Sequence, residues 1–323
     1  MYSIHFWSPR LLSVLLPMLM AAGCRQEPED RDLPPLPGEP TATTGDTGAV
    51  PGAAVGTTYR RTVIFMETSP DSSMFVPWDF VNRVEADGIR RSTRGWLGRA
   101  GEWRMFVQED WTTELTRAPW RIVPRGSARL VVGLDDAITE IYFREGLRDL
   151  SVRPGEVVAE WNGQRGETFR LRAGTAVLAG VETQGLVLDA FTARTTAGDE
   201  FTELALLTGD DGFQLVVADV EGTGLYRAWA RTDTESYSWS EVEVVWQETR
   251  TFERARRDVP VLWRIDAAEP DLSGEFEAVS SHLHTPPGTG ALLPVFGVYE
   301  VRGHVDLETG RIDVAGFLRH FQR

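Results

Sequence analysis

The strongest constraint on the fold is a series of short apolar runs separated by turn residues. The runs are rich in Val, Ile, Leu, Phe and Trp; examples are TVIFME, ARLVVGL, TFRLR, FQLVVADV, EVEVVW and VYEVRGHVDL. Turn sequences such as Thr208-Gly209-Asp210-Asp211-Gly212 stand between them. Short β-branched and aromatic runs bounded by Gly, Asp, Asn or Pro indicate β-strands. The chain from residue 58 to residue 323 is therefore expected to be all-β.

The number of runs limits the architecture further. About fifteen strands without alternating helices argue against a parallel α/β sheet and fit antiparallel barrels or sandwiches. No fixed repeat of the WD or kelch kind is present, which argues against a propeller. Two barrels of about eight strands each would use this number, and we expect them at residues 58–195 and 196–323. One helix is predicted, at Met74–Asp87, where Phe80, Val81 and Val84 share a helical face.

The N-terminal residues have the pattern of a targeting segment. Residues 11–22, LLSVLLPMLMAA, form an apolar run that is too short to span a bilayer but has the length of a secretory signal. The run ends in Ala21-Ala22-Gly23-Cys24. This sequence resembles the bacterial lipobox, in which the Cys thiol accepts a diacylglycerol. We expect a signal peptide at 1–23 and lipidation at Cys24; the alternative is a non-lipidated signal peptide cut nearby, with Cys24 incidental.

Residues 24–57 are rich in Pro, Gly, Thr and acidic groups, and they predict a disordered tether between the lipid and the folded region. Cys24 is the only cysteine, so the folded region must be held by core burial without a disulfide. Arg25 follows it, where an Asp often retains lipoproteins at the inner membrane. We therefore expect a lipid-anchored protein of the cell envelope, at the outer membrane. The net charge of −15 argues against nucleic acid as a partner.

The C-terminal stretch carries a family resemblance. Over residues 260–320, VLWRID, LSGEFEA and LLPVFGVYEVRGHVDLETGRIDVAGFL resemble the closing half of the carotenoid hydratase and AttH-like proteins. The resemblance implies two lipocalin-like β-barrel domains. It also implies acidic, His and Trp side chains that transfer a proton to an alkene. Because Trp239 has no acid–His partner beside it and no histidine lies between His5 and His282, no catalytic residue is assigned from the family.

Four tryptophans in the first half are candidate ligand-binding residues: Trp96, Trp103, Trp111 and Trp120. Tryptophan offers a wide apolar face and one hydrogen-bond donor, and such residues line ligand cavities in barrels. They also fill ordinary cores. Both interpretations fit the sequence.

Three histidines are candidate metal ligands. His282 and His284 are two residues apart and share a strand face, together with Phe276 if the strand is continuous. With His304 from a neighbouring strand they would supply three zinc ligands, and Glu300 would orient one of them. The alternative is a group of rim histidines beside a loop. No zinc motif is present, and we expect no metal and no cofactor.

An arginine cluster, Arg254-Ala255-Arg256-Arg257-Asp258, stands just before the VPVLWRI run. It fits either a clamp for a carboxylate or phosphate or a salt-bridged connector between domains, and the acidic composition favours the connector.

Three functions remain open. The first is a lipoprotein whose lipocalin-like cavity binds a hydrophobic or amphipathic small molecule. The second is a hydratase or isomerase that uses a buried acid and base on an apolar substrate. The third is an envelope scaffold without cavity chemistry.

Overall fold

The computed structural model describes residues 54–68, 74–123, 125–133, 137–145, 148–162, 167–194, 202–219, 224–286 and 288–323. These residues form seventeen β-strands and no α-helix, which confirms the all-β prediction. Among them there is no helix with the length and apolar character needed to cross a membrane. Cys24, the signal segment and the tether up to residue 53 lie outside the described residues.

Strands β1–β9 form the first sheet, a nearly closed antiparallel barrel. Its strands are β1 (Thr58–Glu67), β2 (Met74–Glu85), β3 (Gly88–Arg99), β4 (Glu102–Thr113), β5 (Ala128–Val132), β6 (Ile138–Glu145), β7 (Arg148–Asn162), β8 (Thr168–Leu178) and β9 (Val181–Arg194). The strand order is β4-β3-β2-β1-β9-β8-β7-β6-β5. The ring centroids of Phe106 on β4 and Phe143 on β6 lie 5.0 Å apart, so the two ends of the sheet curl toward each other.

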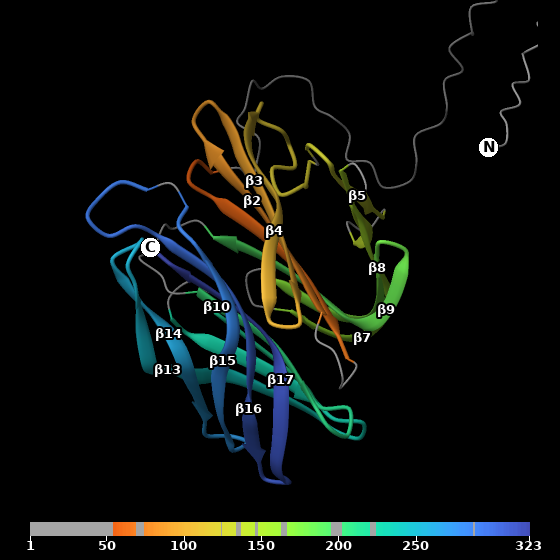
Figure 1. The fold of residues 1–323 in the computed structure, drawn as a ribbon, viewed down its shortest axis with the longest axis vertical. Helices are drawn as coiled ribbons and strands as arrows, with labels where there is room; N and C mark the ends of the chain where they lie inside the picture. Colours follow the sequence, from red (N-terminus) through yellow and green to blue (C-terminus); the bar gives the residue numbers. More distant parts are fainter. Residues whose placement is uncertain are drawn as a thin grey trace, which may run out of the picture. The chain divides into compact units, whose positions relative to one another are not determined.

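Strands β10–β17 form the second sheet, a closed eight-stranded barrel (Figure 1). Its strands are β10 (Thr202–Gly209), β11 (Gln214–Asp219), β12 (Tyr226–Arg231), β13 (Ser236–Phe252), β14 (Arg257–Ala267), β15 (Leu272–His284), β16 (Val295–Leu307) and β17 (Gly310–Gln322). Each strand pairs with the next, and β17 closes the barrel on β10. Residues 195–201, where the domain boundary was expected, lie outside the described residues.

Three apolar clusters account for most of the core. One fills the first barrel and includes Trp78 and Phe80; another fills the second barrel and includes Trp263 and Tyr299. The third contains outward-facing residues of both sheets and packs the barrels against each other. In this third cluster the rings of Trp96 and Phe296 stack with centroids 4.9 Å apart. Many strands are therefore buried on both faces.

The helix predicted at Met74–Asp87 is wrong, because Met74–Glu85 is strand β2. Trp78 and Phe80 point into the first barrel, whereas Phe75 points toward the second. Burial on both faces removes the alternation of apolar and polar residues that usually marks a strand. The remaining apolar run fits a helical period as well as a strand, and only the tertiary contacts distinguish the two.

Candidate active site

Four polar side chains meet inside the second barrel, near one end. Glu203 lies on β10 and His320 on β17, and the two residues are direct cross-strand partners. Ala205 and Leu207, which follow Glu203 at two-residue steps, belong to the barrel core, so Glu203 also faces inward. Tyr226 on β12 and Trp246 on β13 complete the group, which we call the inward cluster.

The Glu203 carboxylate accepts a hydrogen bond from each of its three neighbours. Its Oε1 lies 3.0 Å from His320 Nδ1 and 2.9 Å from Trp246 Nε1. The Tyr226 hydroxyl donates to Oε2. Glu203 is 3 % exposed and the His320 side chain is fully buried. The carboxylate is therefore held by three donors in a place that water does not reach freely.

The electrostatics of the inward cluster favour an ionised Glu203. Burial by itself raises the pKa of this carboxyl, but hydrogen bonds from His320, Tyr226 and Trp246 and the positive charge of protonated His320 bring the pKa below its ordinary value of 4.5. The pKa of the Tyr226 hydroxyl is raised by burial and by the neighbouring Glu203 charge. Tyr226 thus stays a neutral donor, and Glu203 is the negative centre.

Polar atoms without a hydrogen-bond partner face the same barrel interior. Among the described residues, His320 Nε2, the Tyr299 hydroxyl and Trp263 Nε1 are buried and have none. Gly297 pairs with His320 across the strands, and a Cβ there would lie 2.6 Å from the Tyr299 ring. Because Gly297 has no side chain, the Tyr299 ring can lie over it, diagonally beside His320. A polar group of a substrate or a water would satisfy these atoms.

The four candidate tryptophans do not share one environment. Trp96 stacks on Phe296, and Trp103 stacks on Phe75 with ring centroids 5.8 Å apart; both lie between the barrels. Trp103 Nε1 also donates to Ser280 Oγ of the second barrel over 2.9 Å. The structure gives Trp96 and Trp103 packing partners, and ligand contact at them stays a prediction.

The other two tryptophans lie apart from that packing. The Trp111 ring lies under the guanidinium of Arg125, and Arg125 Cζ is 5.9 Å from the centroid of that ring. Trp120 is 38 % exposed, and its ring centroid lies 6.1 Å from that of Tyr59. Ligand contact at Trp111 and Trp120 likewise stays a prediction.

The register of the strands separates the candidate metal ligands. His282 pairs with Val298, whereas His304 lies six residues further along β16, a distance of about 20 Å. The described residues contain no group of three or more His, Cys, Asp and Glu side chains placed to hold a metal ion. His282, His284 and His304 are therefore not brought together. His304 instead faces Asp306, with Nε2 3.6 Å from Oδ2.

A β-bulge explains why His282 and His284 leave the barrel core. The pairing of β15 with β16 shifts between Ala278 and Ser280. Beyond the bulge, His282 and His284 pair with Val298 and Phe296, which face the first barrel. The expected common face with Phe276 is wrong, because the bulge moves the later residues to the opposite side of the sheet.

The arginine cluster is not a connector between domains. Glu253–Arg256 form the turn between β13 and β14 of the second barrel. Arg257 begins β14, and its Nε donates to the Leu293 carbonyl over 2.8 Å. This expectation is corrected because the segment joins neighbouring strands of one barrel.

Sequence reasoning did not select the inward cluster. Glu203 and His320 are 117 positions apart, and neither belongs to a recognisable motif. One usable signal was the FTELALL run. In it Glu203 lies two and four residues before core residues Ala205 and Leu207, so the three share one face of the strand. A carboxylate at an inward strand position needs a buried partner, but the sequence does not say which histidine supplies it.

Comparison with known proteins identifies the fold. No protein-family model matches the chain, and no curated protein matches it significantly. An AttH-like protein from Nitrosomonas europaea has a TM-score of 0.55 at 12% identity, covering 89% of this chain and 98% of that chain. Kievitone hydratase from Nectria haematococca has a TM-score of 0.55 at 10% identity, covering 87% and 96%.

A third solved structure agrees with these two. CghA with Sch210972 has a TM-score of 0.50 at 11% identity and covers 83% of this chain and 88% of that chain. At such low identity the likeness concerns the fold. The matches extend over both barrels, beyond residues 260–320, which carry the sequence resemblance. The chain has the all-β, two-domain lipocalin-like fold of these hydratase-like and AttH-like proteins.

Proposed function

We propose that the protein is an acid–base enzyme of the hydratase or isomerase type that acts on an apolar substrate. The observation that carries the proposal is the Glu203–His320 pair, joined over 3.0 Å inside an otherwise apolar barrel. Glu203 would hold the imidazole ring, and His320 would move the proton. An acid–base enzyme accounts for this pair better than simple ligand binding does, because a binding cavity for a hydrophobe does not need such a pair.

The cost of burying the pair supports a functional role. Removing a carboxylate and an imidazolium from water costs several kcal/mol for each ion, and their attraction only partly offsets it. An apolar pair of similar volume would stabilise the barrel as well or better. Buried groups with perturbed pKa values and a specific charged partner are typical of catalytic sites.

The chemistry follows from the two nitrogens of His320. Nδ1 faces Glu203, so the hydrogen bond to the carboxylate fixes the orientation of the ring. Nε2 has no partner among the described residues and is available as the donor. In hydration, Nε2–H would protonate one alkene carbon, a water oxygen would bond to the other carbon, and the excess proton would return to Nε2. The net change is the addition of one water molecule to the double bond.

Isomerisation would use the same first step. After protonation, a different proton would leave the neighbouring carbon and return to Nε2, so that the double bond moves and no atom is gained. The shared fold agrees with this class of chemistry, since one of the similar structures is kievitone hydratase. The apolar interior around the inward cluster favours an alkene-bearing hydrophobe as the substrate.

Deuterium uptake tests the proposal. Retinoids, carotenoid fragments, unsaturated fatty acids and quinones would be incubated with the protein in deuterated water and analysed by mass spectrometry for added water or deuterium. Glu203→Gln and His320→Gln should each lower the rate by about 100-fold or more, the usual contribution of general acid–base catalysis. His304→Gln changes a histidine on the outer face and should retain the rate. Full activity in both inward variants would refute the assignment.

Anchoring is a separate proposal that rests on the sequence. We infer that Cys24 carries the lipid and that the enzyme is held at the cell envelope, at the outer membrane. The LPMLMAAGC sequence before the tether supports this inference. Membrane lipid would then be a covalent partner, and apolar substrates that partition into the bilayer would be concentrated near the barrels.

A further inference from the structure

The polypeptide between β4 and β5 covers one end of the first barrel. Its residues 114–123, which we call the cap, contain no strand. The Arg121 carbonyl accepts hydrogen bonds from Asn82 Nδ2 over 3.0 Å and from Arg91 Nη1 over 2.7 Å. Asn82 and Arg91 are buried cross-strand partners that face inward, since Asn82 lies two residues after the core residue Phe80. The cap is therefore fastened to polar groups at that end of the barrel interior.

The outer surface of the cap is both apolar and basic. Leu115, Trp120 and Val123 are 49 %, 38 % and 39 % exposed. Arg117 and Arg121 lie between them in the sequence and are exposed as well. Large apolar side chains that stay exposed on one short segment, with arginines among them, are typical of surfaces that contact another molecule or a membrane.

The charge of this segment is opposite to that of the whole chain. Residues 114–133 contain four arginines and one acidic residue, Glu114, whereas the chain has a net charge of −15. In the part of the chain that the structure describes, Arg117 and Arg125 have no carboxylate partner. The adjacent β2–β3 turn is acidic at Asp87, so the positive surface is limited to the cap and Arg125.

The cap lies where the chain enters the fold. The ring centroid of Trp120 is 6.1 Å from that of Tyr59, at the start of β1. Gly56 N, two residues before β1, donates to a carbonyl near the end of β2 over 2.8 Å. Residues 25–53 connect this point to Cys24, and a flexible chain of that length spans roughly 30 Å. An anchor at Cys24 would thus keep this end of the barrel near the bilayer.

We propose that the cap docks on the anionic surface of the bilayer that carries the anchor, an inference that rests on the proposed lipidation of Cys24. The exposed apolar side chains would enter the headgroup region, and the amphipathic ring of Trp120 suits that boundary. The arginines would pair with lipid phosphates. Because the tether enters beside the cap, a bilayer fits this surface better than a soluble partner does.

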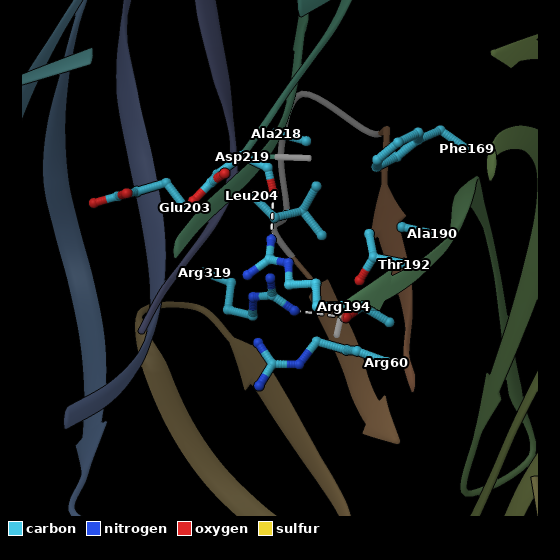
Figure 2. A pocket seen from close by; sticks show the side chains of 11 residues that line it. Arg60, Phe169, Ala190, Thr192, Arg194, Glu203, Leu204, Ala218, Asp219 and Arg319 are labelled. Atoms are coloured by element: carbon cyan, nitrogen blue, oxygen red, sulfur yellow. Dashed lines mark hydrogen bonds between the residues drawn. The ribbon is translucent and has the colours of Figure 1, made fainter. Parts of the chain in front are cut away.

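Docking of the cap would position both barrels together, because the junction between them is closely packed. Arg319 Nη1 of β17 donates to Thr62 Oγ1 of β1 over 2.6 Å. Arg194 Nη2 of β9 donates to the Asp219 carbonyl of β11 over 2.6 Å. Figure 2 shows these two arginines close to Arg60. The space enclosed there is about 10 Å³, room for roughly one water molecule. The second barrel and its inward cluster would therefore take a fixed orientation over the bilayer.

A single-cysteine label tests the docking. Residues 25–323 contain every described strand but lack the apolar leader and Cys24, so neither of these can hold the protein on a vesicle. Leu115→Cys in this chain would carry an environment-sensitive dye, whose emission should shift to shorter wavelength on vesicles of phosphatidylcholine and phosphatidylglycerol. Val181→Cys is the matched control. Val181 is 60 % exposed at the opposite end of the first barrel, and a dye there should not shift.

Charge variants distinguish the cap from the rest of the surface. Arg117→Gln should weaken vesicle binding, measured by co-sedimentation, about fivefold, the usual contribution of one arginine near an anionic surface. Arg144→Gln removes an exposed arginine of β6 that is bonded to Asp149, and it should leave binding unchanged. Trp120→Ala should also weaken binding, and vesicles of phosphatidylcholine alone should bind much less protein. Circular dichroism of each variant checks that the β-structure is retained.

Three results would overturn the docking surface: equal dye shifts at Leu115 and Val181, no shift at Leu115 on anionic vesicles, or equal vesicle binding with and without Arg117→Gln. Tighter binding of soluble polyphosphate than of vesicles would assign the cap to a soluble polyanion instead. Since the assay lacks Cys24, its failure would leave the anchoring proposal standing, and a failure of Cys24 to take up lipid would leave the vesicle result standing.

Discussion

Removal of the Glu203 carboxylate should be among the most destabilising single changes in the second barrel. In Glu203→Leu, the donors of His320, Tyr226 and Trp246 lose their acceptor while they stay buried. Each unsatisfied buried donor costs about 1–3 kcal/mol, which gives a loss of about 3–9 kcal/mol. Since a domain is stable by only about 5–15 kcal/mol, this variant should unfold at a much lower urea concentration or fail to fold.

Glu203→Gln removes the negative charge of the side chain but keeps its shape. The amide oxygen can still accept from His320 and Trp246, and the amide NH2 can donate to the Tyr226 hydroxyl once that group rotates. Three charge-assisted hydrogen bonds become neutral ones, a loss of about 1 kcal/mol each. We therefore expect a cost of about 3 kcal/mol at pH 7, clearly less than for leucine. Glu243→Gln, at an exposed position of β13, is the matched control and should be within about 0.5 kcal/mol of wild type.

The stability difference between wild type and Glu203→Gln should depend on pH. The pKa of Glu203 is lowered in the folded protein from its ordinary value of 4.5, the net result of burial, which raises it, and of His320 and its other donors, which lower it. A carboxyl with a lowered folded pKa contributes stability above its unfolded pKa and loses that contribution as pH falls through the folded pKa. The difference between wild type and Glu203→Gln should thus shrink below about pH 4.5.

Urea unfolding followed by tryptophan fluorescence, at several pH values between 7 and 3, measures all of these differences. The reasoning would be refuted if Glu203→Leu matched wild type within about 0.5 kcal/mol. It would also be refuted if the difference between wild type and the glutamine variant grew as the pH fell.

Three other predictions follow from the anchor, the packing between barrels and the barrel interior. Cys24→Ser should abolish incorporation of labelled fatty acid and release the protein from the membrane fraction; unchanged labelling would contradict the lipoprotein proposal. Trp96→Ala removes the ring stacked on Phe296 and should lower the unfolding free energy by about 3–5 kcal/mol in urea titrations, a much larger change than at an exposed site. A hydrophobic ligand bound to the folded protein should raise its melting temperature and quench tryptophan emission; absence of both effects for every retinoid, fatty acid and quinone tried would contradict binding of an apolar molecule.

The sequence by itself determined the class of fold. Short β-branched and aromatic runs between turns, such as FQLVVADV and EVEVVW, specify strands because local conformation and side-chain shape act within a few residues. Their number and the lack of helices alternating with them predicted two antiparallel barrels. The Met74–Asp87 segment was the exception, since a strand buried on both sides by two barrels carries no alternation of its own.

Only the tertiary structure decided which reactive side chains come together. Glu203 and His320 face each other because β17 closes the barrel on β10, a pairing of segments more than a hundred residues apart. A single bulge after Ala278 turned His282 and His284 out of the barrel core, and the register kept His304 away from them. Local patterns fix whether a residue belongs to a strand, but barrel closure and strand register fix which side chains share an interior. These depend on contacts that no short stretch of sequence contains.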